Sequence, residues 1–135
     1  MEPVLIDTSV WIDFFNGKLN TQTSLVKEYL EMEYPVFICP VIIQEILQGI
    51  RNDDSYREVK NNLFNLEILM IDHLESSVGA ADLFRMLRKK GVTIKKSNDC
   101  MIAYYSIYFG IYLLHNDRDF DSIAKHTQLK ILPSS

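Results

Sequence analysis

Two carboxylates stand out because each follows an apolar run. Asp7 comes directly after the run Val4 to Ile6, and Asp117 lies just beyond a run that ends at Leu114. If both runs are strands of one parallel sheet, both aspartates lie at its carboxyl edge, where open α/β folds bind ligands. We therefore expect Asp7 and Asp117 to lie close together in a functional site.

Two further carboxylates lie within apolar helical segments. Glu45 falls inside VIIQEILQGI, and Asp99 is followed by the apolar residues CMIA. An unpaired ionised carboxylate buried there would be destabilising by several kcal/mol, so we expect a cation to face it. A hard divalent cation such as Mg²⁺ or Mn²⁺, which prefers oxygen ligands, would relieve the mutual repulsion of four converging carboxylates.

Each carboxylate also has a purely structural interpretation. Asp7 could cap a short helix that begins near Ser9, and Asp99 would interact favourably with the dipole of its own helix. Glu45 could lie on a solvated strip, and the aspartates of HNDRDFDSIAKH include candidate turn and cap residues. Together these interpretations explain less than a shared site, because capping does not account for Glu45 and a sheet edge accounts only for Asp7 and Asp117.

Short apolar runs alternate with longer helical segments and so predict an α/β fold. The runs expected to be buried strands are 4–6, 36–39, 66–70, 111–114 and 129–132. The predicted helices cover 24–32 and 41–50, a segment opened by a Ser55–Glu58 capping box, 75–90 before Gly91, and a segment capped by Ser97 or Asn98. Strands alternating with helices predict a mostly parallel sheet covered on both faces.

Length and composition predict one folded domain over residues 1–135. The chain is 47% hydrophobic and 24% charged with only 5 Gly and 4 Pro, which excludes low-complexity and disordered classes. The uncharged run 100–114 is shorter than the roughly 18 residues of a membrane span. Cys39 and Cys100 fit no zinc motif, and the N-terminus lacks the pattern of a signal peptide, so we expect a cytoplasmic protein.

Three segments carry a family resemblance. LIDTSVWIDFF, VIIQEILQGI and SNDCMIAYYSIYFGIYLLHNDRDFDSIAKH, with the spacing between them, resemble PIN-domain ribonucleases, specifically VapC-type toxins of toxin–antitoxin pairs. The resemblance covers almost the whole chain and matches the acidic positions of the family to Asp7, Glu45, Asp99 and Asp117. Thr8 and Ser9 match a hydroxyl pair that helps to hold the acidic residues, and Asp119 matches a supporting position. The chain departs from the family at His115, where many relatives carry threonine.

The resemblance implies a PIN-like three-layer sandwich with a sheet of about five strands. It also implies single-strand RNA cleavage, a homodimer, and inhibition by a VapB-like antitoxin whose C-terminal segment crosses the active-site groove. Metal chemistry supports the same activity, because carboxylate-held Mg²⁺ or Mn²⁺ activates water against a phosphodiester without a histidine or cysteine nucleophile.

A basic segment, residues 85–96, is the candidate RNA contact in a chain whose net charge is −4. RMLRKKGVTIKK holds six of the 14 basic residues and no acidic residue. Lys89, Lys90, Lys95 and Lys96 could line a phosphate-binding rim, and Arg118 could contact RNA or neutralise its acidic neighbours. Alternatively, the segment is a solvated helix end that complements its own dipole.

Two other classes of protein share parts of this pattern. A receiver-like protein would also place aspartates at strand ends, but no DxD motif follows the first strand. A non-catalytic PIN-like scaffold that binds RNA or protein would be expected to lose members of the acidic set, which this chain retains. The aromatic residues around Trp11 and Tyr105 are expected to pack in the core, with some left over for a dimer face.

Overall fold

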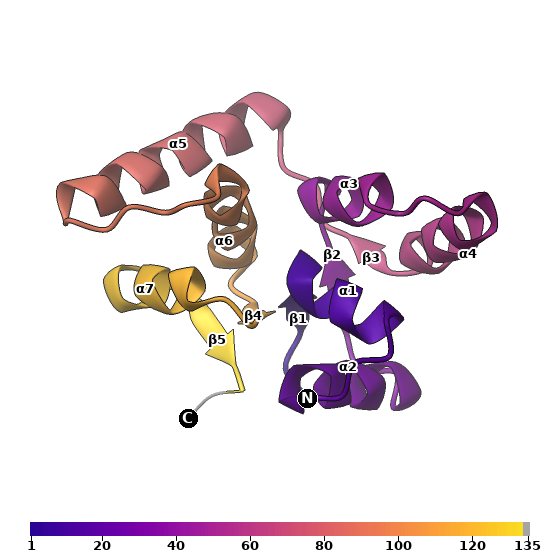
Figure 1. Ribbon diagram of the computed structural model, residues 1–135. Coiled ribbons are helices and arrows are strands. Elements are labelled where there is room, and N and C mark those ends of the chain that lie inside the picture. Colours follow the sequence, from indigo (N-terminus) through magenta and orange to yellow (C-terminus); the bar gives the residue numbers. More distant parts are fainter. Residues whose placement is uncertain (134–135) are drawn as a thin grey trace.

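A five-stranded, entirely parallel sheet forms the centre of the molecule (Figure 1). This computed structural model describes residues 1–133. The strand order is β3-β2-β1-β4-β5, with strands β1 (Val4–Ile6), β2 (Val36–Ile38), β3 (Glu67–Ile68), β4 (Tyr112–Leu114) and β5 (Lys130–Leu132). The predicted α/β class is confirmed, and all five apolar runs contain a strand.

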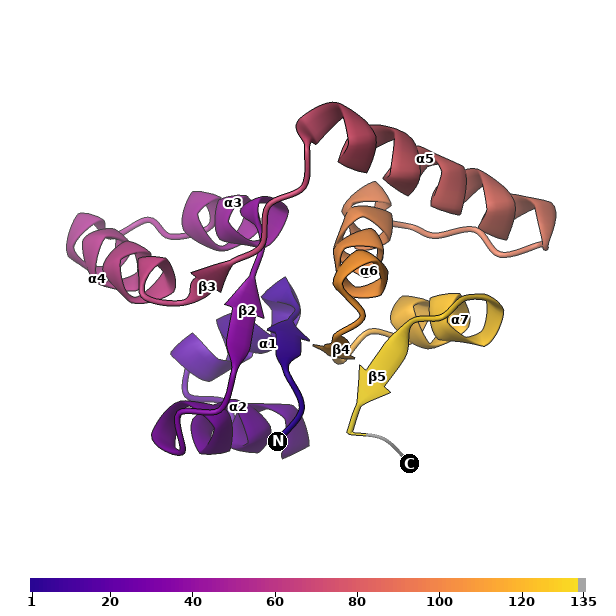
Figure 2. The ribbon, with the colours of Figure 1, turned by 180° about the vertical axis from the view of Figure 1, so that it is seen from behind.

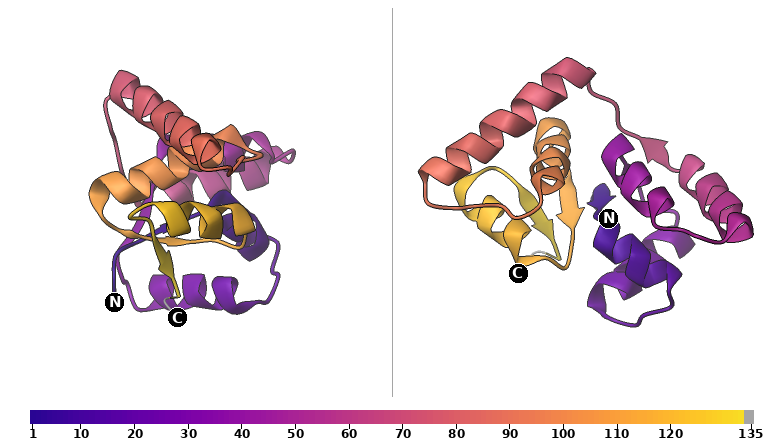
Figure 3. Two further views of the ribbon diagram at one scale, coloured as in Figure 1. Left: turned by 90° about the vertical axis from the view of Figure 1, so that its left-hand side faces the viewer. Right: turned by 45° about the horizontal axis from the view of Figure 1, so that its top comes forward.

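Seven helices in the described residues connect the strands: α1 (Thr8–Phe15), α2 (Thr21–Glu31), α3 (Pro40–Gln48), α4 (Asp53–Phe64), α5 (His73–Lys89), α6 (Ser97–Phe109) and α7 (Arg118–His126). The connections from β1 through β2 to β3 run in one direction across the sheet, and those from β3 through β4 to β5 run back. Right-handed crossovers therefore place α1–α4 on one face and α5–α7 on the other. Figures 1 and 3 show these two groups on opposite sides, and Figure 2 shows the same division from behind.

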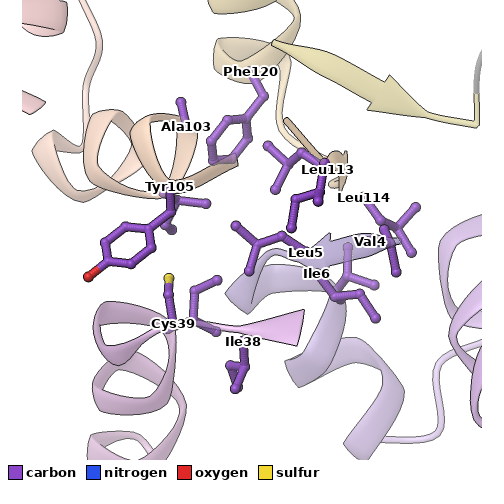
Figure 4. Packing of buried hydrophobic residues seen from close by; sticks show 14 of the residues in the cluster. Val4, Leu5, Ile6, Ile38, Cys39, Ala103, Tyr105, Leu113, Leu114 and Phe120 are labelled. Atoms are coloured by element: carbon purple, nitrogen blue, oxygen red, sulfur yellow. The ribbon is translucent and has the colours of Figure 1, made fainter. Parts of the chain in front are cut away.

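The core lies around the central strands. All three residues of β1 are fully buried, because β1 is flanked by β2 and β4 and covered by helices on both faces. Side chains of β1, β2 and β4 meet Ala103 and Tyr105 of α6 and Phe120 of α7 (Figure 4). Gly79 of α5 allows a close approach to α6, since a Cβ atom there would lie 2.2 Å from the Tyr104 ring.

The edge strand β3 differs from the expectation. Residues 66–70 were expected to be a buried strand, but only Glu67 and Ile68 pair with β2 and both are exposed. An edge strand has a neighbour on one side only, so its side chains are not covered as those of β1 are.

Two predicted helix starts are wrong. Asn52, not a Ser55–Glu58 box, caps α4, because its side chain accepts the backbone N–H of Ser55 at 2.9 Å. Neither Ser97 nor Asn98 caps α6, which begins after Lys96 without a side-chain cap. Asp99 nevertheless lies in the first turn of α6, as predicted.

The strand order reverses between β1 and β4. Chain connections leave this pair in opposite directions, so a crevice opens beyond the carboxyl ends of the two strands, the usual ligand position in open α/β folds. The residues that follow β1 and β4 therefore lie at this crevice.

No helix within residues 1–133 is long and apolar enough to cross a membrane.

Candidate active site

Asp7 is both a helix cap and a buried site residue. It follows β1, is 5% exposed, and caps α1 by accepting the Ser9 backbone N–H at 3.3 Å. The Ser9 hydroxyl donates to the same oxygen, Oδ2, at 2.6 Å. Burial raises the pKa of Asp7, and these hydrogen bonds offset part of the rise. The capping interpretation is thus correct and does not exclude a role in a site.

Glu45 projects from α3 towards the start of α1. Its Oε1 accepts the Thr8 hydroxyl at 2.6 Å, and its Oε2 accepts the Asn98 side-chain amide at 3.3 Å. The half-buried carboxylate has no lysine or arginine within ion-pair distance among residues 1–133. The cation expected to face Glu45 is therefore not supplied by the described chain.

The carboxylate of Asp99 is buried and lies near other negative charges. It is 5% exposed, and its Oδ2 atom is buried without a hydrogen-bond partner. Burial, followed by the nearby carboxylates of Asp7 and Asp117, raises the pKa of Asp99 to about 7, although Lys96 opposes the rise. An orphaned carboxylate oxygen surrounded by like charge favours binding a cation or a proton.

Asp117 approaches from the loop between β4 and α7. It caps α7, with Oδ1 accepting the Asp119 backbone N–H at 2.9 Å, while Oδ2 lies 3.9 Å from Lys96 Nζ. Asp119 in turn accepts the Lys95 backbone N–H at 3.3 Å. Asp119 therefore supports Asp117 through its backbone and fixes the end of the basic segment through its side chain.

The four carboxylates lie near one another, two on α3 and α6 and two at the residues that cap α1 and α7. Asp7, Glu45 and Asp117 all lie close enough to Asp99 to raise its pKa, and among residues 1–133 Lys96 is the one cation that lowers it. In the described part of the chain no three acidic, histidine or cysteine side chains form a ready-made metal-binding cluster. The donor set and the orphaned Oδ2 of Asp99 nevertheless fit a hard divalent cation, towards which the side chains would have to turn.

Comparison with known proteins identifies the family of the chain. The PIN domain family matches residues 4–126. The VapC ribonuclease Mb1587 of Mycobacterium bovis and Ribonuclease VapC11 of Mycobacterium tuberculosis are each 33% identical to the chain over 128 residues. These matches cover 94% of the chain and 96% of each relative. The chain belongs to the PIN-domain family of VapC ribonucleases.

Solved structures share the fold of this PIN domain at lower sequence identity. VapBC2 from Rickettsia felis, bound to a promoter DNA fragment, matches with a TM-score of 0.74 and 20% identity, over 95% of this chain and 96% of that one. DNA-bound VapBC from Salmonella typhimurium matches with a TM-score of 0.74 and 18% identity, over 97% of both chains. These likenesses confirm the predicted PIN-like fold.

Neither cysteine of the PIN domain is a candidate nucleophile. Burial raises the pKa of Cys39 to about 12 and that of Cys100 to about 11. Both thiols are therefore protonated at neutral pH, whereas the thiolate is the reactive form. This agrees with a site whose chemistry depends on carboxylates.

A cleft of about 550 Å³ opens beside Asp117. Lys95, Lys96, Arg118 and Asp119 line it together with Asn116 and Asp117. Arg118 is exposed and forms no ion pair within residues 1–133. Lys89 and Lys90 lie exposed at the end of α5, on the same basic segment but outside the residues that line the cleft.

Sequence reasoning missed two polar contacts of the site. The side chain of Asn98 contacts Glu45 instead of capping α6, and that of Asn116 donates to Asp13 of α1 at 3.0 Å. Asn98 directly precedes Asp99 and Asn116 directly precedes Asp117. Their position beside candidate site residues was the one feature of the sequence that could have indicated a role in the site. That signal does not reveal the partner, because each contact spans more than 50 residues of sequence.

Proposed function

We propose that the protein is a Mg²⁺- or Mn²⁺-dependent endoribonuclease. The observation that carries the proposal is the buried, unpartnered Oδ2 of Asp99, near enough to three other carboxylates for their charges to raise its pKa. The names of the curated relatives support RNA as the substrate. A bound divalent ion would lower the pKa of an attacking water and stabilise charge on the phosphate oxygens.

The residues of the site would bind the metal directly or position the residues that bind it. Asp7, Glu45, Asp99 and Asp117 would hold the metal, and Asp119 would position Asp117 through its backbone N–H. Thr8 would orient Glu45 and Ser9 would orient Asp7, through hydroxyl bonds of 2.6 Å each. Fixed ligands need less reorganisation when the metal binds, which is how contacts beyond the ligands increase metal affinity.

Cleavage by purified protein tests the proposal. Single-stranded RNA should be cut in Mg²⁺ or Mn²⁺, and EDTA should abolish the cleavage. Asp7→Asn and Asp99→Asn should remove activity with the fold intact by circular dichroism, whereas Asp53→Asn, at an exposed position on α4, should remain active. Full activity in EDTA, or in both purified site variants, would contradict the proposal.

A non-catalytic scaffold is the second candidate. The observation in its favour is that no ready-made three-ligand metal cluster exists among residues 1–133. The same experiment decides between the two functions. A scaffold would bind RNA without cutting it at any Mg²⁺ or Mn²⁺ concentration.

We further propose that a VapB-like antitoxin binds and inhibits the protein in the cytoplasm. Structures of similar fold were solved as VapBC complexes, which supports a partner of this kind. Co-expression with the product of the adjacent reading frame should yield a complex that copurifies and cuts RNA more slowly than the free protein. Copurification without any loss of cleavage would contradict an inhibitory partner.

A homodimer is proposed from the exposed apolar residues of α5 and α6. Leu74 is 74% exposed, Val78 52% and Tyr108 50%, all on two helices that pack against each other. Exposed apolar surface of this kind is typical of protein interfaces. Val78→Asp should shift the mass measured by light scattering towards the monomer, whereas Leu19→Asp, at a loop position 92% exposed, should not.

A further inference from the structure

His115 makes a contact that the acidic set alone does not explain. It follows β4 directly and is 7% exposed, the most buried histidine of the described chain. Its ring nitrogen Nδ1 accepts the backbone N–H of Asp117 at 3.0 Å. An accepting Nδ1 carries no proton, so the proton of the neutral ring lies on Nε2.

Two neighbours hold the His115 ring in this orientation. Nε2 lies 3.1 Å from Asp121 Oδ1 on the first turn of α7, and a carboxylate so near favours the proton on that nitrogen. The ring also packs against Phe120, with 5.2 Å between ring centroids. The lone pair of Nδ1 therefore stays directed at the Asp117 backbone.

We propose that His115 is a positioning residue for Asp117, holding its backbone so that its carboxylate faces the metal-binding centre. The inference rests on the proposed function, because it concerns the same metal site. Asp119 already fixes one carboxylate oxygen of Asp117 through its backbone N–H. The contact from His115 fixes the backbone on the other side of the same residue.

The loop between β4 and α7 thus has three anchors. His115 holds the Asp117 N–H, Asp119 holds the Asp117 carboxylate, and the Asn116 side chain donates to Asp13 Oδ2 on α1. Three short contacts over five residues leave little freedom for Asp117. Loss of outer contacts to a metal ligand typically lowers metal affinity about 10- to 100-fold.

Two substitutions separate the two ends of the imidazole. His115→Asn keeps an acceptor, Oδ1, at the position of Nδ1 and loses the group near Asp121. His115→Gln places its polar atoms near the position of Nε2 and loses the acceptor for Asp117. His126→Gln, at an exposed position on α7, is the matched control.

Mn²⁺ affinity by calorimetry and amide exchange by NMR are the two readouts. We expect His115→Gln to bind Mn²⁺ about tenfold more weakly and to exchange the Asp117 amide proton faster in the metal-free protein. His115→Asn should stay within about threefold of wild type in affinity, since its acceptor rescues the contact. His126→Gln should match wild type in both measurements.

Two results would overturn the positioning role. One is wild-type Mn²⁺ affinity and wild-type exchange in His115→Gln. The other is an equal loss in the Asn and Gln variants, which would reduce His115 to a packing residue. Failure of wild-type protein to bind Mn²⁺ would instead overturn the proposed function, and with it the role of His115 in metal binding.

Discussion

The acidic centre, formed by Asp7, Glu45, Asp99 and Asp117, and the basic segment 85–96 differ in burial and in the contacts that fix their side chains. Asp7 and Asp99 are each 5% exposed, and hydrogen bonds from Ser9, Thr8 and the Asp119 backbone fix the centre. The basic residues are exposed, and Lys96, 3.9 Å from Asp117, is the one member with an ion pair inside the described residues. The buried acidic centre provides the fixed geometry that catalysis needs. The exposed basic segment provides positive charge, and attraction of a polyanion depends on charge more than on fixed geometry.

The two regions also differ in their effect on stability. Burial of Asp99, together with repulsion from Asp7 and Asp117, raises the pKa of Asp99 and disfavours its charged form in the metal-free fold. The exposed lysines are screened by solvent and contribute little to stability. Substitutions in the two regions should therefore separate stability from RNA affinity.

The largest expected effect is in the acidic centre. Asp99→Asn should lower the cleavage rate by about 10³-fold or more. Without this ligand the metal would bind poorly, and the transition state would lose several kcal/mol of electrostatic stabilisation. The same change should raise the thermal midpoint of the metal-free protein by a few degrees, since it removes a buried, repelled charge. Cleavage rates and thermal unfolding in EDTA measure the two effects.

A loss of activity together with a gain in stability would show that the charge of Asp99 serves metal binding and not folding. A metal-free midpoint that falls in Asp99→Asn would show that the carboxylate is stabilised by contacts within the chain. Asp53→Asn, on the exposed surface of α4, should change neither quantity.

The next effect concerns the basic segment. Lys89→Glu, Lys90→Glu and Lys95→Glu together should weaken RNA binding about 10- to 100-fold at low salt and flatten its salt dependence, because each lost phosphate contact removes about 0.7 from the slope for single strands. Lys96 is left in place because it lies beside Asp117. Fluorescence anisotropy with labelled single-stranded RNA, over a salt series, measures both quantities.

A control with equal charge change uses positions away from the segment. Lys27→Glu, Lys60→Glu and Lys125→Glu alter the net charge by the same amount on α2, α4 and α7. Equal losses of affinity in both triple variants would mean that overall charge, not a defined rim, attracts RNA.

The positions of the four carboxylates were easier to predict from the sequence than the hydrogen bonds that they make. Asp7 and Asp117 were predictable because strand ends of a parallel sheet share an edge, and Glu45 because its helix is otherwise apolar. Asn98 was not predictable as a contact of Glu45, because 53 residues separate them and only the packing of α3 against α6 joins them.

The fold was predictable where periodicity was strong and less so at its edges. Buried β1 matches its predicted residues, whereas exposed β3 keeps only two of the five predicted, since edge pairing depends on neighbours and not on local pattern. The α4 cap was wrongly predicted for a similar reason. Asn52 and Ser55 are both good caps, and the backbone path before α4 chooses between them.

A smaller effect is expected at the hydroxyl that holds Glu45. Thr8→Val keeps the shape of the side chain but loses the 2.6 Å bond to Glu45 Oε1. Metal affinity should fall about tenfold, because Glu45 is then free to turn away from the centre. The Mg²⁺ concentration that gives half-maximal cleavage should rise, with the maximal rate near wild type.

Exposed Thr93 provides the control for Thr8. Thr93→Val makes the same chemical change in the basic segment, away from the four carboxylates, and should leave the Mg²⁺ requirement unaltered. A loss of maximal rate in Thr8→Val that saturating Mg²⁺ does not restore would mean that the hydroxyl acts on the substrate and not on Glu45.

The smallest effect is the pH dependence of stability in the metal-free protein. The pKa of Asp99 is about 7 in the folded state against 3.8 as its ordinary value, so the folded state binds more protons between these two pH values. The free energy of unfolding should therefore fall as pH rises from about 4 to about 7, by linkage. Asp7, whose pKa is also raised, contributes with the same sign.

Thermal midpoints in EDTA for wild type and Asp99→Asn isolate the contribution of Asp99 from that of all other groups. The two proteins should be similar near pH 4, and Asp99→Asn should become the more stable one as pH approaches 8, by a few degrees. Mg²⁺ added at pH 8 should raise the wild-type midpoint and leave that of Asp99→Asn nearly unchanged, because a cation replaces the proton only where the carboxylate can release it. A constant difference between the two proteins over the whole range would mean that Asp99 titrates normally, and the electrostatic contrast between the acidic centre and the surface would then be lost.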